Sequence, residues 1–201
     1  MQTNYFNRID ESSDLNFYVQ PRFVAHIDDD AINYVTMLYR ELLPANGAIL
    51  DLMSSWISHL PPEIEYQKVV GLGLNREELA ATERLDNFVV QSLNANQTLP
   101  FDDAEFDAAC CCVSVQYLVK PETVFREIAR ALKKDAPLIV TFSNRCFPTK
   151  AVFAWNALDD EGHIELVRQY FAASESFANI TVRKHQPRNG DPLFGVIGTR
   201  I

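Results

Sequence analysis

Short apolar runs alternate with segments of helical periodicity along most of the chain. The apolar runs have the length of buried strands, and their uniform character is typical of parallel strands that are covered on both faces. The predicted strands are Ala48 to Leu52, Tyr66 to Leu72, Asn87 to Leu93, Phe106 to Val113, Leu138 to Phe142, Ile180 to Lys184 and Leu193 to Thr199. This alternation predicts an α/β fold with a doubly wound, mostly parallel sheet and helices on both faces.

Apolar positions spaced three and four residues apart predict the helices between these strands. One helix runs to about Leu43. Asp28, Asp29 and Asp30 at its start favour N-capping over a metal site, because consecutive carboxylates on a helix diverge. The other predicted helices are a short one with Trp56, Ile57 and Leu60, one capped by Asn75, one opened by Pro121, and two over Ala151 to Leu158 and Ile164 to Phe171, separated by acidic residues 159–162.

The length of 201 residues and the apolar content of 47% fit a single domain. We expect this domain over residues 28–201, behind an N-terminal flap of residues 1–27 whose polar beginning is loosely held. The net charge of −9 argues against nucleic-acid binding. An apolar run of about 18 residues is absent, so we expect a cytoplasmic protein without a membrane partner.

Three of the four cysteines, Cys110, Cys111 and Cys112, are consecutive and lie inside the fourth predicted strand. This spacing excludes a disulfide framework and a zinc-type C-x-x-C pair. We therefore expect reduced cysteines that fill the core on alternate faces of the strand, and no metal site.

Four motifs follow one another in a characteristic order. They are Ile49-Leu50-Asp51-Leu52-Met53-Ser54-Ser55-Trp56, Val69-Val70-Gly71-Leu72-Gly73-Leu74, Leu99-Pro100-Phe101 followed by Phe106-Asp107, and Arg126-Glu127-Ile128-Ala129-Arg130-Ala131-Leu132-Lys133. Over about residues 45–143 the chain resembles the class I S-adenosylmethionine-dependent methyltransferases, especially the type 11 methyltransferase-domain group. The resemblance implies a Rossmann-like, seven-stranded sheet with an antiparallel last strand, and S-adenosylmethionine as cofactor.

The resemblance also indicates where the cofactor site departs from the family. Asp51 keeps the place of the acid that ends the first strand, but Met53, Ser55 and Ile57 occupy the three glycine places of the following turn. Gly73 stands where a carboxylate commonly binds the ribose. The implied cofactor-binding residues are Asp51, Leu52, Met53, Ser54, Ser55, Gly73, Leu74, Ser92, Asn94 and Ser114.

Methyl transfer from a sulfonium is an in-line displacement, so positioning can supply most of the catalysis. Acceptors that lose a proton need a base, and Tyr117 and His26 are the catalytic candidates, with His59 as a further titratable group. In the resembled family the sequence ahead of the first strand often folds over the site, so Tyr18 and Arg22 are also candidates. The favoured interpretation of this segment is a flap that is docked by its aromatic residues and contains a structural histidine. The predicted substrate-binding residues are Gln116, Asn144 and Arg145, the last of which suits a carboxylate or phosphate.

The favoured interpretation is an S-adenosylmethionine-dependent methyltransferase with a small-molecule substrate. The missing glycines and ribose acid keep open an alternative, a methyltransferase-like binding or regulatory protein without catalysis. A nicotinamide-dependent oxidoreductase would need the same glycines for its pyrophosphate. A hydrolase would need a nucleophile elbow or a metal constellation, and neither is present in the sequence. The identity of the acceptor and the oligomeric state stay open.

Overall fold

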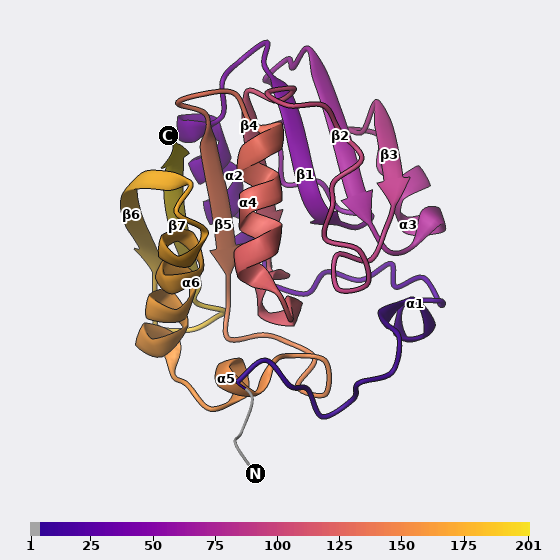
Figure 1. Cartoon of the computed structure of the whole chain (residues 1–201), viewed down its shortest axis with the longest axis vertical. Coiled ribbons are helices and arrows are strands. Elements are labelled where there is room, and N and C mark those ends of the chain that lie inside the picture. Colours follow the sequence, from indigo (N-terminus) through magenta and orange to yellow (C-terminus); the bar gives the residue numbers. More distant parts are fainter. Residues whose placement is uncertain (1–4) are drawn as a thin grey trace.

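Seven strands form one sheet at the centre of the structure, a computed structural model that describes residues 5–201 (Figure 1). They are β1 (Ala48–Ser54), β2 (Lys68–Gly73), β3 (Asn87–Val90), β4 (Ala108–Cys112), β5 (Pro137–Phe142), β6 (Phe177–His185) and β7 (Leu193–Arg200). Their spatial order is β3-β2-β1-β4-β5-β7-β6, and β7 runs antiparallel to both of its neighbours. The predicted α/β class, the mostly parallel sheet and the antiparallel last strand are confirmed.

Helices cover both faces of this sheet. The helices are α1 (Asp14–Phe17), α2 (Asp29–Leu42), α3 (Arg76–Ala80), α4 (Pro121–Ala131), α5 (Phe153–Asn156) and α6 (Asp160–Ser174), with a 3₁₀ turn η1 (Val115–Tyr117). Alternate strand residues point to opposite faces, so Ile49 packs with Val35 of α2, whereas Leu50 belongs to the core that contains Val124 of α4. In Figure 1, α4 and α6 lie in front of the sheet and α2 lies behind it.

The helix starts follow the side-chain caps predicted from the sequence. The Asp28 carboxylate accepts from the Ala31 N–H, and the Asn75 side chain accepts from the first N–H groups of α3, which satisfies donors that the helix itself leaves unpaired. The two helices predicted on either side of residues 159–162 form as α5 and α6, but the break lies at residues 157–159 and α6 begins at Asp160 instead of Ile164. Asp159 caps α6 and the following acids form its first turn, where the helix dipole favours negative charge.

The prediction of a short helix around Trp56, Ile57 and Leu60 is wrong: residues 55–67 contain no helix. A helix this short would gain few backbone hydrogen bonds. Tertiary hydrogen bonds hold this segment instead. The Ser55 carbonyl accepts from Thr82 Oγ1 at 2.8 Å, and the Trp56 indole N–H donates to the Val24 carbonyl at 3.2 Å. As a result, no helix N-terminus follows β1.

The sequence predicts a loosely held N-terminal segment, and this prediction is wrong for the described residues 5–14. The ammonium group of Lys150, which has no exposed surface, donates to the Ser12 carbonyl at 2.7 Å and lies 3.1 Å from an Asp10 oxygen. Asp14 is also buried and pairs with the Arg8 guanidinium at 2.6 Å. The Lys150 contacts tie residues 5–14 to the segment after β5, and the Arg8–Asp14 pair holds the N-terminal segment together. Residues 1–4 of the predicted flap lie outside the described residues.

The cysteines of β4 lie where the strand pattern predicted. Cys110 and Cys111 are buried in the cores on opposite faces of the sheet, Cys112 is half-buried, and all the cysteines have free thiols. No helix among residues 5–201 has both the length and the apolar character needed to cross a membrane.

Candidate functional site

A cavity of about 290 Å³ lies at the carboxyl ends of β1, β2, β3 and β4. β1 and β4 are neighbours although their sequence positions are far apart, so the strand order reverses between them. In open α/β sheets, ligands bind in the crevice at such a switch point. The N-terminal segment (residues 5–27) runs along this edge of the sheet and closes one side of the cavity, together with the segment 145–150 (Figure 1).

Most of the residues predicted to bind cofactor or substrate line this one cavity. They are Met53, Ser54, Ser55, Gly73, Leu74, Ser92, Asn94 and Ser114 of the predicted cofactor set, together with His26, Tyr117 and Arg145. The structure therefore brings together groups from the ends of four strands and from both flanking segments.

Four predicted site residues lie outside the cavity. Asp51 and Leu52 are buried farther back along β1, on opposite faces of the sheet. Gln116 has no exposed surface, because its side chain turns inward and donates to the Val113 carbonyl at 3.0 Å, which holds the turn after β4. Asn144 is exposed and borders a separate shallow hollow beside Trp155.

The first glycine place of the family turn is occupied by Met53, whose φ angle is 55°. A residue with a Cβ pays roughly 1–2 kcal/mol in this left-handed region. The strain is local, since Met53 forms a bulge in the pairing of β1 with β2 between Leu52 and Ser54. β1 therefore continues as a strand to Ser54 instead of turning into a glycine-rich loop.

Gly73 lies directly against this extension of β1. A Cβ atom at Gly73 would be 2.2 Å from the Ser54 carbonyl oxygen, well inside any tolerated contact. The main chain of β1 thus occupies the space that a side chain at the end of β2 would need. The absence of the ribose carboxylate and the bulge at Met53 are two consequences of one backbone arrangement.

Glu78 brings a carboxylate to the cavity that the sequence interpretation did not assign to the site. It comes from α3, is buried, and accepts from the Arg22 backbone N–H at 2.7 Å and from the Ser55 hydroxyl. The available signal was an acid shortly after Gly73, in the first turn of a helix capped by Asn75. Glu78 lies several residues after Gly73, the position at which the family carries its ribose-binding acid, so the motif comparison did not select it.

Arg22 is held by aromatic rings of two segments. Its guanidinium carbon lies 4.6 Å from the ring centre of Phe17, 5.2 Å from that of Tyr18 and 5.4 Å from that of Phe147. Its Nη2 donates to the Phe17 carbonyl at 2.8 Å. These contacts set the position of a cation in the wall of the cavity.

The two catalytic candidates differ in what they can do with a proton. Burial raises the pKa of Tyr117 to about 12, and its hydroxyl oxygen accepts from the Phe147 N–H at 2.9 Å. Tyr117 is therefore a neutral phenol that positions the segment after β5. Burial lowers the pKa of His26, so its ring is neutral at pH 7 and able to accept a proton.

A second cavity, of about 80 Å³, lies behind the end of β1 and shares Met53, Ser54 and His26 with the first. Asp51 faces it, with its carboxylate accepting from the Ser54 hydroxyl at 2.7 Å and from the Cys110 thiol at 3.6 Å. Burial raises the pKa of Asp51 to about 6. Burial also lowers the pKa of His59, another lining residue, to about 4. The chamber therefore disfavours charge.

Replacing Asp51 with Asn is expected to remove a pH-dependent cost of folding. The folded-state pKa of about 6 lies above the ordinary value of about 3.9, so ionisation of Asp51 lowers stability as the pH rises through this window. Asp51→Asn is expected to gain about 1–3 kcal/mol over the parent at pH 7.5 and little at pH 4. Urea unfolding at both pH values measures this difference. The exposed Asp102→Asn variant is the control, and parallel pH profiles for Asp51→Asn and the parent would contradict the assignment.

Comparison with known proteins identifies a matching family model and similar folds. Residues 52–140 match a family model described as a methyltransferase domain, whereas no curated protein matches the sequence. The described fold is similar to the PH0226 protein of Pyrococcus horikoshii OT3, with a TM-score of 0.64, 16% identity, and coverage of 92% of this chain and 99% of that one.

Two further solved structures show how varied the proteins with this fold are. One is an S-adenosylmethionine-dependent methyltransferase of Thermotoga maritima, described as a possible histamine N-methyltransferase, with a TM-score of 0.61, 18% identity, and coverage of 85% of this chain and 90% of that one. The other is the [4+2]-cyclase SpnF, with a TM-score of 0.60, 15% identity, and coverage of 84% and 81%. At such identities the likeness concerns the fold. The chain therefore shares the fold of these methyltransferase structures, and its residues 52–140 match the methyltransferase-domain family model.

Proposed function

We propose that this protein is an S-adenosylmethionine-dependent methyltransferase that acts on a small molecule. The observation that carries the proposal is the cavity of about 290 Å³, which is lined by residues at the ends of β1, β2, β3 and β4 at the switch point of the sheet. Its size is close to the lower end of the range for small-molecule pockets, about 300–1,000 Å³. In this proposal residues 5–27 act as a flap over the domain formed by residues 28–201.

The lining residues fit the two halves of the cofactor differently. Leu74 and the hydroxyl of Ser92 would contact the adenine, and the Glu78 carboxylate would bind the ribose hydroxyls in place of the acid absent at Gly73. The amino-acid end would meet Ser54 and Ser55 of the β1 extension, without a glycine turn or a helix N-terminus. We therefore expect a weaker site than one with the complete family motif.

His26 is the residue that we assign to the proton of the acceptor. When bound, S-adenosylmethionine supplies an electrophilic methyl group, and an acceptor that is a hydroxyl or an amine loses one proton on transfer. His26 lies in the cavity wall, with its ring 5.4 Å from that of Phe147 and in an edge-on arrangement, and it is neutral at pH 7. It can therefore take that proton and release it through its exposed side.

A second candidate function is a methyltransferase-like binding or regulatory protein without catalysis. The close approach of the Ser54 carbonyl to Gly73 and the loop in place of a helix after β1 favour it. The loop lacks the N–H donors with which a helix N-terminus would face an anionic ligand end, and the close approach at Gly73 leaves no room for a ribose-binding carboxylate at that position. A ligand that lacks an amino-acid end would not need those donors.

Calorimetric titration with S-adenosylmethionine and its demethylated product tests the proposal. The parent is expected to bind both with a dissociation constant on the order of 0.1 mM, because the amino-acid end lacks the N–H donors of a glycine turn and loss of one charged hydrogen bond weakens binding about ten- to a hundredfold. Glu78→Gln is expected to weaken binding about tenfold. The exposed Glu83→Gln is its matched control.

Met53→Gly serves as a companion variant. Glycine tolerates the left-handed φ angle and opens space beside the cavity, so affinity is expected to rise. If neither the parent nor Met53→Gly produces heat at millimolar ligand, the proposed cofactor use is wrong and the binding-protein candidate gains support.

A further inference from the structure

Arg22 is a cation without an acidic partner in a protein rich in acids. It forms no ion pair with any residue of 5–201, and its side chain makes a single hydrogen bond, to the Phe17 carbonyl. Its Nη1 atom is buried without a hydrogen-bond acceptor. A guanidinium has five N–H donors, so most of the hydrogen-bonding capacity of Arg22 is unused.

The acids that line the cavity do not neutralise this guanidinium. Asp14 is paired with Arg8 at 2.6 Å and lies 3.7 Å from Lys150. Glu78 accepts from the backbone N–H of Arg22, not from its side chain. A charge that is partly withdrawn from water and lacks a counterion is costly, and an anion that enters the site recovers this cost.

Arg145 adds a second cation to the same wall of the cavity. It lies two residues before Phe147, whose ring packs on the Arg22 guanidinium. Its side chain is 63% exposed, and its closest acid is Asp191, at 3.8 Å from Nε. Such an exposed pair contributes little to stability, so Arg145 can turn towards a ligand at small cost.

We propose that Arg22 and Arg145 form an anion-binding subsite, and that the methyl acceptor is a small organic acid whose carboxylate they bind. This inference rests on the proposed function. The subsite lies between the N-terminal segment and the segment after β5, and it adjoins the proposed ribose position because the Arg22 backbone N–H donates to Glu78 at 2.7 Å. The guanidinium fork suits a planar carboxylate. The rings of Tyr18, Tyr117 and Phe147 beside it suit a flat organic body.

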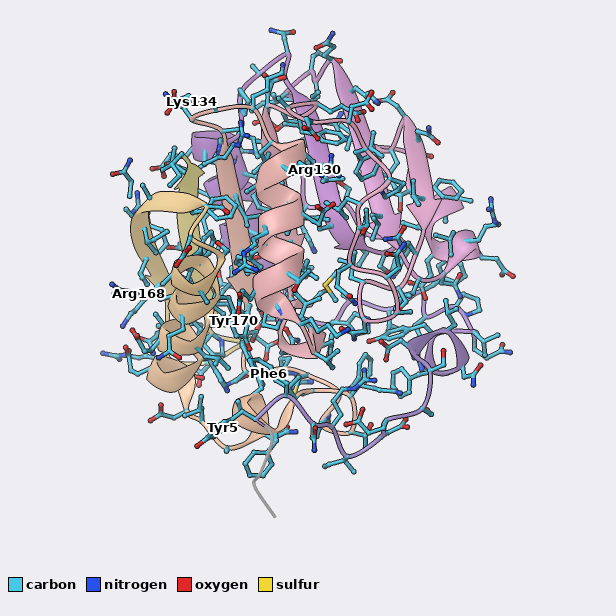
Figure 2. All side chains as sticks on the ribbon, in the orientation of Figure 1. Tyr5, Phe6, Arg130, Lys134, Arg168 and Tyr170 are labelled. Atoms are coloured by element: carbon cyan, nitrogen blue, oxygen red, sulfur yellow. The ribbon has the colours of Figure 1, made fainter. Side chains whose placement is uncertain are left out.

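Titration with benzoate, followed by ligand-observed NMR, tests the subsite without the true acceptor. Benzoate is expected to bind with a dissociation constant on the order of 1 mM, and its neutral analogue benzamide at least about tenfold more weakly. Arg22→Gln is expected to weaken benzoate binding about ten- to a hundredfold, and Arg145→Gln about threefold. Arg168→Gln, on α6 and outside the cavity lining, is the matched control and should bind as the parent does (Figure 2).

The variants must also be shown to fold. An unchanged thermal unfolding midpoint establishes this, and Arg22→Lys provides a milder change that keeps the charge but removes the fork. Arg22→Lys is expected to bind benzoate with intermediate affinity. Equal binding of benzoate and benzamide by the parent, or undiminished benzoate binding by Arg22→Gln, would overturn the subsite.

A competition arm separates this inference from the proposed function. Benzoate is expected to bind equally well when the protein is saturated with the demethylated cofactor. Displacement of benzoate by that product would mean that Arg22 holds the cofactor carboxylate, which would overturn the assignment to the acceptor. If the protein binds benzoate but no cofactor, the proposed methyl transfer is wrong, whereas the anion-binding subsite is supported.

Discussion

Gly73→Ala is expected to destabilise the protein by about 2–4 kcal/mol, as overpacking against the main chain does. The added Cβ would lie 2.2 Å from the Ser54 carbonyl oxygen and 3.1 Å from a methyl group of Leu79. The side chain of Leu79 can adjust, but the Ser54 carbonyl belongs to β1 and moves only if its pairing with β2 changes. The free energy of unfolding in urea measures the effect.

Gly195→Ala is the matched control for this substitution. Gly195 is also a strand glycine, but an added Cβ would meet its nearest atoms at 3.4 to 3.7 Å, which is ordinary van der Waals contact. We expect a change below about 1 kcal/mol. Unchanged stability in Gly73→Ala would show that the end of β1 is free to move, and the account of the closed ribose position would then be wrong.

This expectation bears directly on any attempt to restore the family motif. Gly73→Asp places the missing carboxylate at its family position, but its Cβ meets the same carbonyl oxygen. Loss of affinity in that variant would therefore report a displaced strand and not the value of the carboxylate. Glu78→Gln is the informative change, because Glu78 already lies in the cavity wall.

Lys150→Met is expected to cost about 3 kcal/mol of stability and to release the N-terminal segment. The Lys150 ammonium has no exposed surface and joins Asp10, Ser12 and Asp14 to the segment after β5. Methionine has a similar length but no donor, so the Ser12 carbonyl and the Asp10 carboxylate lose their partner. Urea unfolding measures the loss of stability, and faster amide exchange in residues 5–27 measures the release.

Lys134→Met is the matched control, since Lys134 is exposed after α4 at the opposite end of the strands (Figure 2). We expect a change within about 0.5 kcal/mol. If Lys150→Met kept the amide protection of residues 5–27, the segment would be held by its aromatic contacts with Phe147 instead of by the buried cation.

The periodicity and the capping residues of the sequence by themselves determined the class of fold and nearly all of its elements. The strand β4 is recognised by an apolar run that is buried on both faces, and the helix α2 by a periodic apolar stripe and an N-cap, and the chain displays both signals directly. The side of the sheet that Asp51 faces also follows from the period of two along β1. The resemblance then supplied the antiparallel direction of the last strand, which local patterns do not contain.

Only the tertiary structure decided the chemistry of the cavity, because its groups meet across long stretches of chain. Lys150 contacts Ser12 across a separation of 138 residues, and Glu78 contacts Arg22 across 56. The bulge at Met53 depends on pairing with β2, and that same pairing closes the ribose position at Gly73. The loop after β1 is a similar case, since the hydrogen bonds from Thr82 and to Val24 override a weak local helical pattern. Such contacts stabilise the fold only after distant segments have been brought together, so no local pattern in the sequence predicts them.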